Sequence, residues 1–217
     1  MLEKLYTIFE NEGFRFIKKE NNYLLLKRNG GEKFEYFVIE ESTKLGNVLE
    51  NQNQVFKKIK QESDDKELEK NTTYLICFKS DKLPLSSIEY KQILEIEEDS
   101  YYFRKLVLPY TQNQLTKLDT TNDFANIIKD INKFEEFKED CKAKNLSESL
   151  YEIVSQLYIK LPFFKLPTIS ERKNIILEKY RNSLDEKESK ILNFIENIDI
   201  ENIEDSEEFY KKIEDMI

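Results

Sequence analysis

Hydrophobic and polar positions in the first forty residues predict one helix followed by three strands. Apolar residues recur at helical spacing from Leu2 to Phe9, and Gly13 follows where a left-handed residue commonly ends a helix. Three β-like segments come next, at residues 14–19, 23–27 and 34–39. Asn29-Gly30-Gly31 separates the last two and predicts a hairpin, because these residues tolerate positive φ.

The following forty residues predict a helix and a buried strand. The helix is expected from Thr43 to about Lys60, although the polar run Asn51–Gln54 weakens its middle. Asp64–Lys70 is a charged loop or a short helix. Thr72–Phe78 (TTYLICF) is β-branched, aromatic and uncharged, which is typical of a buried strand.

The next segment begins at Pro84, and its apolar residues Ile88, Ile93 and Leu94 indicate a helix. Residues 101–108 suit either a strand or a buried helix, and the sequence leaves both open.

From residue 122 onward the apolar period is helical almost throughout. One helix is expected over 124–134 and another over 146–161, with Asn145 or Ser147 as its N-cap. Pro162 and Pro167 then bracket a rigid hydrophobic elbow, KLPFFKLP. Three further helices are expected, at about 170–184, 186–198 and 204–217.

These elements predict an α+β fold. A small N-terminal mixed sheet of about four to five strands, flanked by helices, precedes a mostly α-helical C-terminal half. The best division lies near 115–122, between an α/β domain at 1–118 and a helical domain at 119–217. The two parts are also able to pack as one unit.

Composition excludes several classes of active site. The chain has no His, which removes Ser-His-Asp and Cys-His sites and His-ligated zinc. Its two Cys, at 77 and 141, are too far apart in sequence for a CxxC pair, and four Gly leave no room for a phosphate-binding loop. We therefore expect a protein that is not an enzyme, with no catalytic, cofactor-binding or metal-binding residues.

The charge is concentrated at one end of the chain. Residues 185–217 carry twelve acids and four Lys, a net charge of −8 out of −9. Only five of the 34 basic residues are Arg, so we expect little direct binding to nucleic acid. The N-terminus does not resemble a signal peptide, apolar runs are too short for a membrane helix, and unpaired Cys favour the cytoplasm.

The order helix, three strands, helix, strand over residues 2–78 is also the core order of restriction-type nucleases. Those enzymes need an Asp on the second strand and Glu-x-Lys on the third to hold a metal ion. Here the second strand has no acid, and Glu35 is followed by Tyr36-Phe37. An inactive relative of that fold fits these residues better than a working nuclease.

Three groups of residues are candidates for partner contacts or for structural roles. An acidic run with Glu95 precedes three aromatic residues, two Phe form the elbow, and the last segment has an apolar row with Ile217. Metal binding by the acids and burial of the aromatics in the core are the alternatives. The candidates are Glu97, Glu98, Asp99, Tyr101, Tyr102, Phe103, Phe163, Phe164, Phe209, Tyr210 and Ile213.

Two of these segments carry a family resemblance. IEEDSYYFRKLVLPYT (96–111), followed by SQLYIKLPFF (155–164), resembles middle component 1 of bacterial ABC-three-component systems, which overlap the Lamassu antiphage defence family. Ser100 departs from the Pro that family members often have there. The matching residues are Ile96, Glu97, Glu98, Asp99, Tyr101, Tyr102, Phe103, Val107, Tyr110, Ile159, Lys160, Leu161, Pro162 and Phe163.

The resemblance implies a non-catalytic accessory subunit of an antiphage defence complex. Its partners would be an SMC/Rad50-like ABC ATPase and a nuclease-type effector, which the subunit would bridge or gate. Two alternatives stay open: a divergent restriction-type metal-dependent nuclease, and a stand-alone regulatory or immunity-type protein-binding module.

Overall fold

The computed structural model describes residues 1–20, 22–31, 33–166, 184–185, 188–189 and 192–193. Met1–Leu166 form one compact unit, and the elements below belong to it. The helices expected at 170–184, 186–198 and 204–217 lie almost entirely outside the described residues, as do Phe209, Tyr210 and Ile213.

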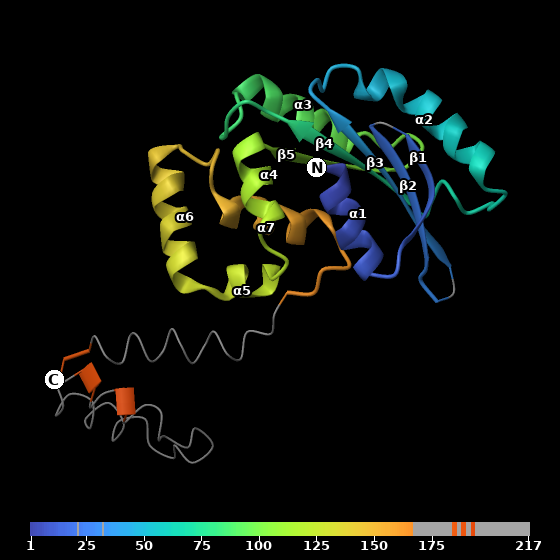
Figure 1. Ribbon diagram of the computed structural model, residues 1–217. Helices are drawn as coiled ribbons and strands as arrows, with labels where there is room; N and C mark the ends of the chain where they lie inside the picture. Colours follow the sequence, from blue (N-terminus) through green and yellow to red (C-terminus); the bar gives the residue numbers. More distant parts are fainter. Residues whose placement is uncertain (21, 32, 167–183, 186–187, 190–191, 194–217) are drawn as a thin grey trace, which may run out of the picture. The chain divides into compact units, whose positions relative to one another are not determined.

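A single mixed sheet forms the centre of this unit, as the sequence predicts (Figure 1). Its strands lie side by side in chain order: β1 (Arg15–Glu20), β2 (Tyr23–Asn29), β3 (Phe34–Ser42), β4 (Thr72–Lys79) and β5 (Arg104–Tyr110). The first three are antiparallel, whereas β4 and β5 run parallel to β3. Residues 101–108, which suited two structures, therefore contribute to a strand at the edge of the sheet.

Helices cover both faces of the sheet. They are α1 (Leu2–Asn11), α2 (Val48–Glu62), α3 (Ser87–Glu98), α4 (Gln112–Asp119), α5 (Phe124–Lys129), α6 (Ile131–Ala143) and α7 (Leu150–Lys160). Figure 1 shows α2 and α3 on one face and α1, α4 and α7 on the other. Among the described residues, no helix is long and apolar enough to cross a bilayer.

The face that carries α1 and α7 has an aromatic core. The Phe9 ring lies 4.9 Å from Phe37 and 4.8 Å from Phe163, in edge-to-face geometry. Phe163 is buried, and Phe164 is half-buried beside Tyr158. The structure therefore places Phe163 of the elbow in the core.

The opposite face packs α2 and α3 against the same strands. Ile59 of α2 and Ile96 of α3 are buried there together with Tyr74 of β4. Because β4 is covered on both faces, almost all of its residues are buried, which explains the uncharged run Thr72–Phe78.

The prediction of one continuous helix over 124–134 is wrong, because this segment contains the end of α5 and the start of α6. Asp130 has extended backbone angles, and its carboxylate accepts hydrogen bonds from the amides of Asn132 and Lys133. The backbone of Asp130 thus ends α5 and its side chain caps α6, so the apolar period continues across a break in the backbone.

Two other helix starts differ from the expectation. The helix expected from Thr43 begins at Val48, after the N-cap residue Asn47. The N-cap of α7 is Ser149, whose hydroxyl accepts from the amide of Glu152. Ser147 instead accepts a hydrogen bond from the amide of Leu83, a contact that its sequence position does not reveal.

The domain division that the sequence predicts near 115–122 overlaps a helix, α4. Its capping box joins Thr111 and Gln114, and the buried Gln114 amide donates to the carbonyl oxygens of Leu146 and Ser149. Because α4 packs on α7, the helices α5, α6 and α7 share one compact unit with the sheet.

Candidate functional site

The loop between α3 and β5 wraps around a buried lysine. The Lys105 ammonium pairs with Asp99 Oδ1 at 2.5 Å, and the Lys105 side chain is fully buried. It also donates to the carbonyl oxygens of Asp99 (3.2 Å), Tyr101 (2.7 Å) and Phe103 (3.3 Å). A buried ammonium is tolerated only when its donors are satisfied in this way, so these contacts fix the loop.

This loop separates the three consecutive aromatic residues. Tyr101 is 70% exposed, whereas Phe103 is 4% exposed and lies edge-on to Tyr74 at 5.5 Å. Tyr102 has a left-handed backbone (φ 67°) and places its ring 4.7 Å from Phe56. Tyr101 is therefore the member of the run that faces solvent.

The acidic residues before the loop also point to different partners. Glu97 accepts hydrogen bonds from the Val107 amide (2.7 Å) and from Lys160 Nζ (2.5 Å). Asp99 holds Lys105, and Glu98 is exposed. Among the described residues no group of three or more acids or cysteines is arranged to hold a metal ion.

The ion pair of Glu97 and Lys160 brings the two motif segments together at the edge of the sheet, beside a groove. The groove has a volume of about 380 Å³ and follows the free edge of β5, with α3 as one wall and α7 as the other. We name it the β5 groove. Its lining residues are Leu83, Pro84, Leu85, Tyr90, Ile93, Leu94, Glu97, Val107, Pro109, Leu146, Glu152, Gln156, Ile159 and Lys160.

The rim of the β5 groove exposes large apolar side chains. Tyr90 and Leu94 on α3 are 60% and 41% exposed, and Ile159 on α7 is 67% exposed. Single exposed apolar residues are common on protein surfaces, but a cluster of them around a concave site is typical of a binding surface.

Glu152 is a half-buried carboxylate within the groove. It accepts a hydrogen bond from Gln156 Nε2 at 3.1 Å, and no cation of the described chain forms an ion pair with it. Burial raises the pKa of the Glu152 carboxyl above its usual value, because desolvation disfavours the charged form.

The backbone edge at the floor of the groove is blocked against strand addition. Pro109 of β5 has no amide hydrogen, and the Val107 amide is already bound to the Glu97 carboxylate. Both are ways in which natural sheets protect an edge strand.

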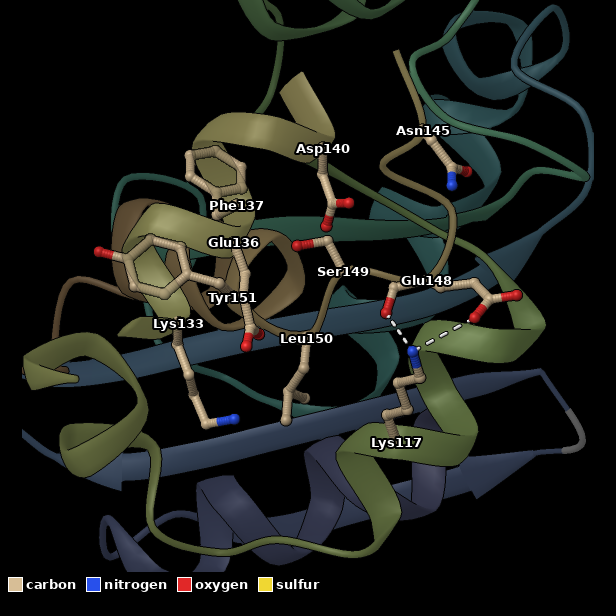
Figure 2. A pocket seen from close by; sticks show the side chains of 10 residues that line it. All are labelled: Lys117, Lys133, Glu136, Phe137, Asp140, Asn145, Glu148, Ser149, Leu150 and Tyr151. Atoms are coloured by element: carbon tan, nitrogen blue, oxygen red, sulfur yellow. Dashed lines mark hydrogen bonds and ion pairs between the residues drawn. The ribbon is translucent and has the colours of Figure 1, made fainter. Parts of the chain in front are cut away.

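A second hollow, of about 330 Å³, lies beside α4, α6 and the start of α7 (Figure 2). Lys117 donates to the backbone carbonyl and the carboxylate of Glu148 there, and the Phe137 ring stacks on Tyr151 at 5.1 Å. Because charges of both signs line this hollow, it offers no ligand of one sign a favourable site.

The acids of β3 are bound to different partners. Glu40 accepts a hydrogen bond from the Tyr74 hydroxyl, and its neighbour Glu41 accepts one from Tyr110. Tyr74 and Tyr110 lie on opposite faces of the sheet, so the two carboxylates diverge. Glu35 is paired with Arg28 at 2.6 Å.

Sequence reasoning missed Tyr90, Glu152 and Ile159 as residues of one site. Ile159 and Lys160 belong to the second motif, and Tyr90 lies four residues before Leu94 at helical spacing. The sequence signals were therefore the motif and the helical spacing, and neither shows which face stays exposed.

The molecule is an α+β protein with an open groove, rimmed by exposed apolar side chains, at one edge of its sheet. The family model of the ABC-three component (ABC-3C) system Middle Component 1 matches residues 34–152, more than half of the 217-residue chain. The chain belongs to this family. No curated protein and no solved structure matches the chain.

Proposed function

We propose that this chain is the non-catalytic accessory subunit of a Lamassu-type antiphage defence complex, where it bridges an SMC/Rad50-like ABC ATPase and a nuclease-type effector. The family supports the general role, because a middle component belongs to a system with other components. The two partners and the bridging role are part of the proposal.

The observation that carries this proposal is the β5 groove. Tyr90, Leu94 and Ile159 remain exposed around a hollow that a bound protein would fill. The contacts of the buried Lys105 ammonium fix the loop after α3, and the ion pair of Glu97 with Lys160 joins α3 to α7. Such a preorganised surface loses little entropy on binding.

A non-catalytic role fits the state of the acidic residues. Glu40 and Glu41 are engaged by tyrosines on opposite faces, and Asp99 is engaged by a buried lysine. Metal-dependent cleavage needs several carboxylates converging on one point with open positions for metal and water. These contacts favour the accessory role over the nuclease alternative.

We place the complex in the cytoplasm. Cys77 and Cys141 are both free thiols, the first buried and the second exposed. Unpaired cysteines agree with a reducing compartment. The partners are proteins, and direct contact with nucleic acid has a small role in this proposal.

Co-expression with the ABC ATPase and the effector of the same system tests the proposed function. We expect the three proteins to co-elute in size-exclusion chromatography, and the isolated chain neither to hydrolyse ATP nor to cut DNA. Elution apart from both proteins at micromolar concentration would favour the stand-alone binding module. DNA cleavage by the isolated chain with Mg²⁺ or Mn²⁺ would favour the nuclease.

A further inference from the structure

We infer that the β5 groove binds an amphipathic helix of a companion component, which places apolar side chains between α3 and α7 and a Lys or Arg opposite Glu152. This inference rests on the proposed function, because it assumes that companion components exist. It adds the secondary structure and the charge of the bound segment.

The blocked edge of β5 favours a helix over an added strand. An added strand needs free amide and carbonyl groups along the edge, but Pro109 has no amide hydrogen and Val107 donates to Glu97. A helix satisfies its own backbone, so it needs only side-chain contacts from the groove. The groove offers such contacts on both walls.

Each wall presents lining residues at helical spacing. Tyr90, Leu94 and Glu97 line it from α3 at i, i+4 and i+7, while Glu152 and Ile159 line it from α7 at i and i+7. Seven residues of helix rise about 10 Å, so each wall presents roughly two turns. A bound helix of two to three turns would cover both exposed rims.

Charge complementarity identifies the polar feature of the bound helix. The other charged residues that line the groove, Glu97 and Lys160, neutralise each other at 2.5 Å. Glu152 has only the neutral Gln156 as a side-chain partner among the described residues, which leaves one net negative charge in the groove. A cation of the partner would supply the missing charge, at low dielectric where pairing is strong.

Glu152 is also unfavourable for the free chain. Burial raises the pKa of its carboxyl, so ionisation of this group lowers the stability of the fold. A glutamine would keep the hydrogen-bonding shape without this cost. A residue that costs stability in the free chain and faces an open groove is explained if it has a binding role.

Two other occupants are possible in principle: a second copy of this chain, and its own residues 167–217. A photo-crosslinking experiment distinguishes them in the full-length chain. Benzoyl-phenylalanine replaces Ile159 on the rim of the groove, and a matched protein carries it in place of Phe16, an exposed residue of β1 at the opposite edge.

The photoreactive proteins are mixed with the purified ATPase and effector and irradiated. We expect the probe at 159 to capture a helical segment of one companion component, with a Lys or Arg within one or two turns of the crosslink, and the probe at 16 to capture none. Crosslinks from 159 to a second copy, to residues 167–217 or to nothing would overturn the inference.

A charge swap tests the predicted cation. Glu152→Lys should weaken binding of the captured component by at least about tenfold. A partner variant with Glu in place of this Lys or Arg should bind the Glu152→Lys chain as the wild-type pair does. The same partner variant should bind the wild-type chain more weakly. If Glu152→Lys binds as tightly as wild type, or if no partner variant restores binding, the assignment of Glu152 is wrong.

These outcomes separate the inference from the proposed function. If the wild-type proteins form the three-component complex and both groove experiments fail, the accessory role stands and the groove assignment falls. If the wild-type proteins do not associate at all, the proposed function itself fails.

Discussion

Glu97 and Lys160 are separated by 63 residues, yet the Glu97 Oε1 atom lies 2.5 Å from the Lys160 ammonium. Glu97 lies near the end of α3, on one face of the sheet, and Lys160 ends α7 on the other. Because Glu97 also accepts from the Val107 amide, one carboxylate joins both helices to the edge strand β5.

Removal of this carboxylate should destabilise the fold. Glu97→Ala leaves the Val107 amide and the largely buried Lys160 ammonium without a partner, so we expect a loss of about 2 kcal/mol in urea denaturation. Glu95→Ala is the matched control, because Glu95 forms an exposed pair with Lys91 and should cost at most about 0.5 kcal/mol. Equal losses in the two variants would show that the pair with Lys160 has no special role.

Loss of the ion pair between Asp99 and the buried Lys105 should destabilise the fold more strongly. Asp99→Asn removes the only carboxylate that pairs with the fully buried Lys105 among the described residues, so unfolding should become easier by about 3 kcal/mol. The double variant Asp99→Asn with Lys105→Met should recover part of this loss, because no uncompensated charge remains. If the double variant loses as much stability as the two single variants added together, Asp99 does not stabilise the fold by compensating the charge of Lys105.

The aromatic run should divide into a core residue and a surface residue. Phe103→Ala removes a ring that is 4% exposed and should cost about 3–5 kcal/mol in thermal or urea unfolding. Tyr101→Ala removes a ring that is 70% exposed and should change stability by less than about 0.5 kcal/mol. A large loss of stability in Tyr101→Ala would mean that its ring is part of the core.

The sequence predicted the sheet well because its strands have strong local signals. Thr72–Phe78 is uncharged and lies in the doubly covered strand β4. Asn29-Gly30-Gly31 forms the expected hairpin, where Gly31 has φ 98° and Asn29 Oδ1 accepts from its amide. Both signals arise within a few residues of the chain.

The break at Asp130 and the N-cap at Ser149 were harder to predict. Several polar residues near each helix start are able to cap it, and tertiary contacts decide among them. Ser147 was one of the two expected N-caps, but its hydroxyl accepts a hydrogen bond from the amide of Leu83, which is 64 residues away in sequence.

The candidate site was predictable only in part. Its two segments were identified by their motifs, but the pairing of Glu97 with Lys160 is a contact between distant residues. Helical spacing assigned Ile88 and Leu94 to one apolar helix, whereas the structure leaves them 72% and 41% exposed. An apolar row does not itself reveal whether a core or a partner covers it.

Glu152 should make stability depend on pH in a defined direction. Burial raises its folded-state pKa, so the folded chain binds more protons than the unfolded chain just above the usual pKa of a carboxyl group. The contribution of Glu152 to stability should therefore fall as pH rises through this window. The other charged residues of the groove are Glu97 and Lys160. On α6, burial and the charge of Glu152 raise the pKa of the Cys141 thiol.

Glu152→Gln removes this titration. Its Tm should exceed that of the wild type at pH 7, and the difference should disappear near pH 4, where the wild-type carboxyl is protonated. Differential scanning calorimetry of both proteins at the two pH values measures the effect. A lower Tm for Glu152→Gln at pH 7 would mean that the carboxylate stabilises the free chain.

The affinity of a groove variant for the companion components tests the central claim most directly. Ile159→Asp and Phe16→Asp each place a charge at an exposed apolar position, but only the first lies at the β5 groove. Isothermal titration calorimetry against the component that the wild-type chain binds should show at least about a tenfold rise in Kd for Ile159→Asp and no change for Phe16→Asp, with both variants as stable as wild type. Unchanged binding by Ile159→Asp would contradict the claim that the β5 groove is the site of assembly.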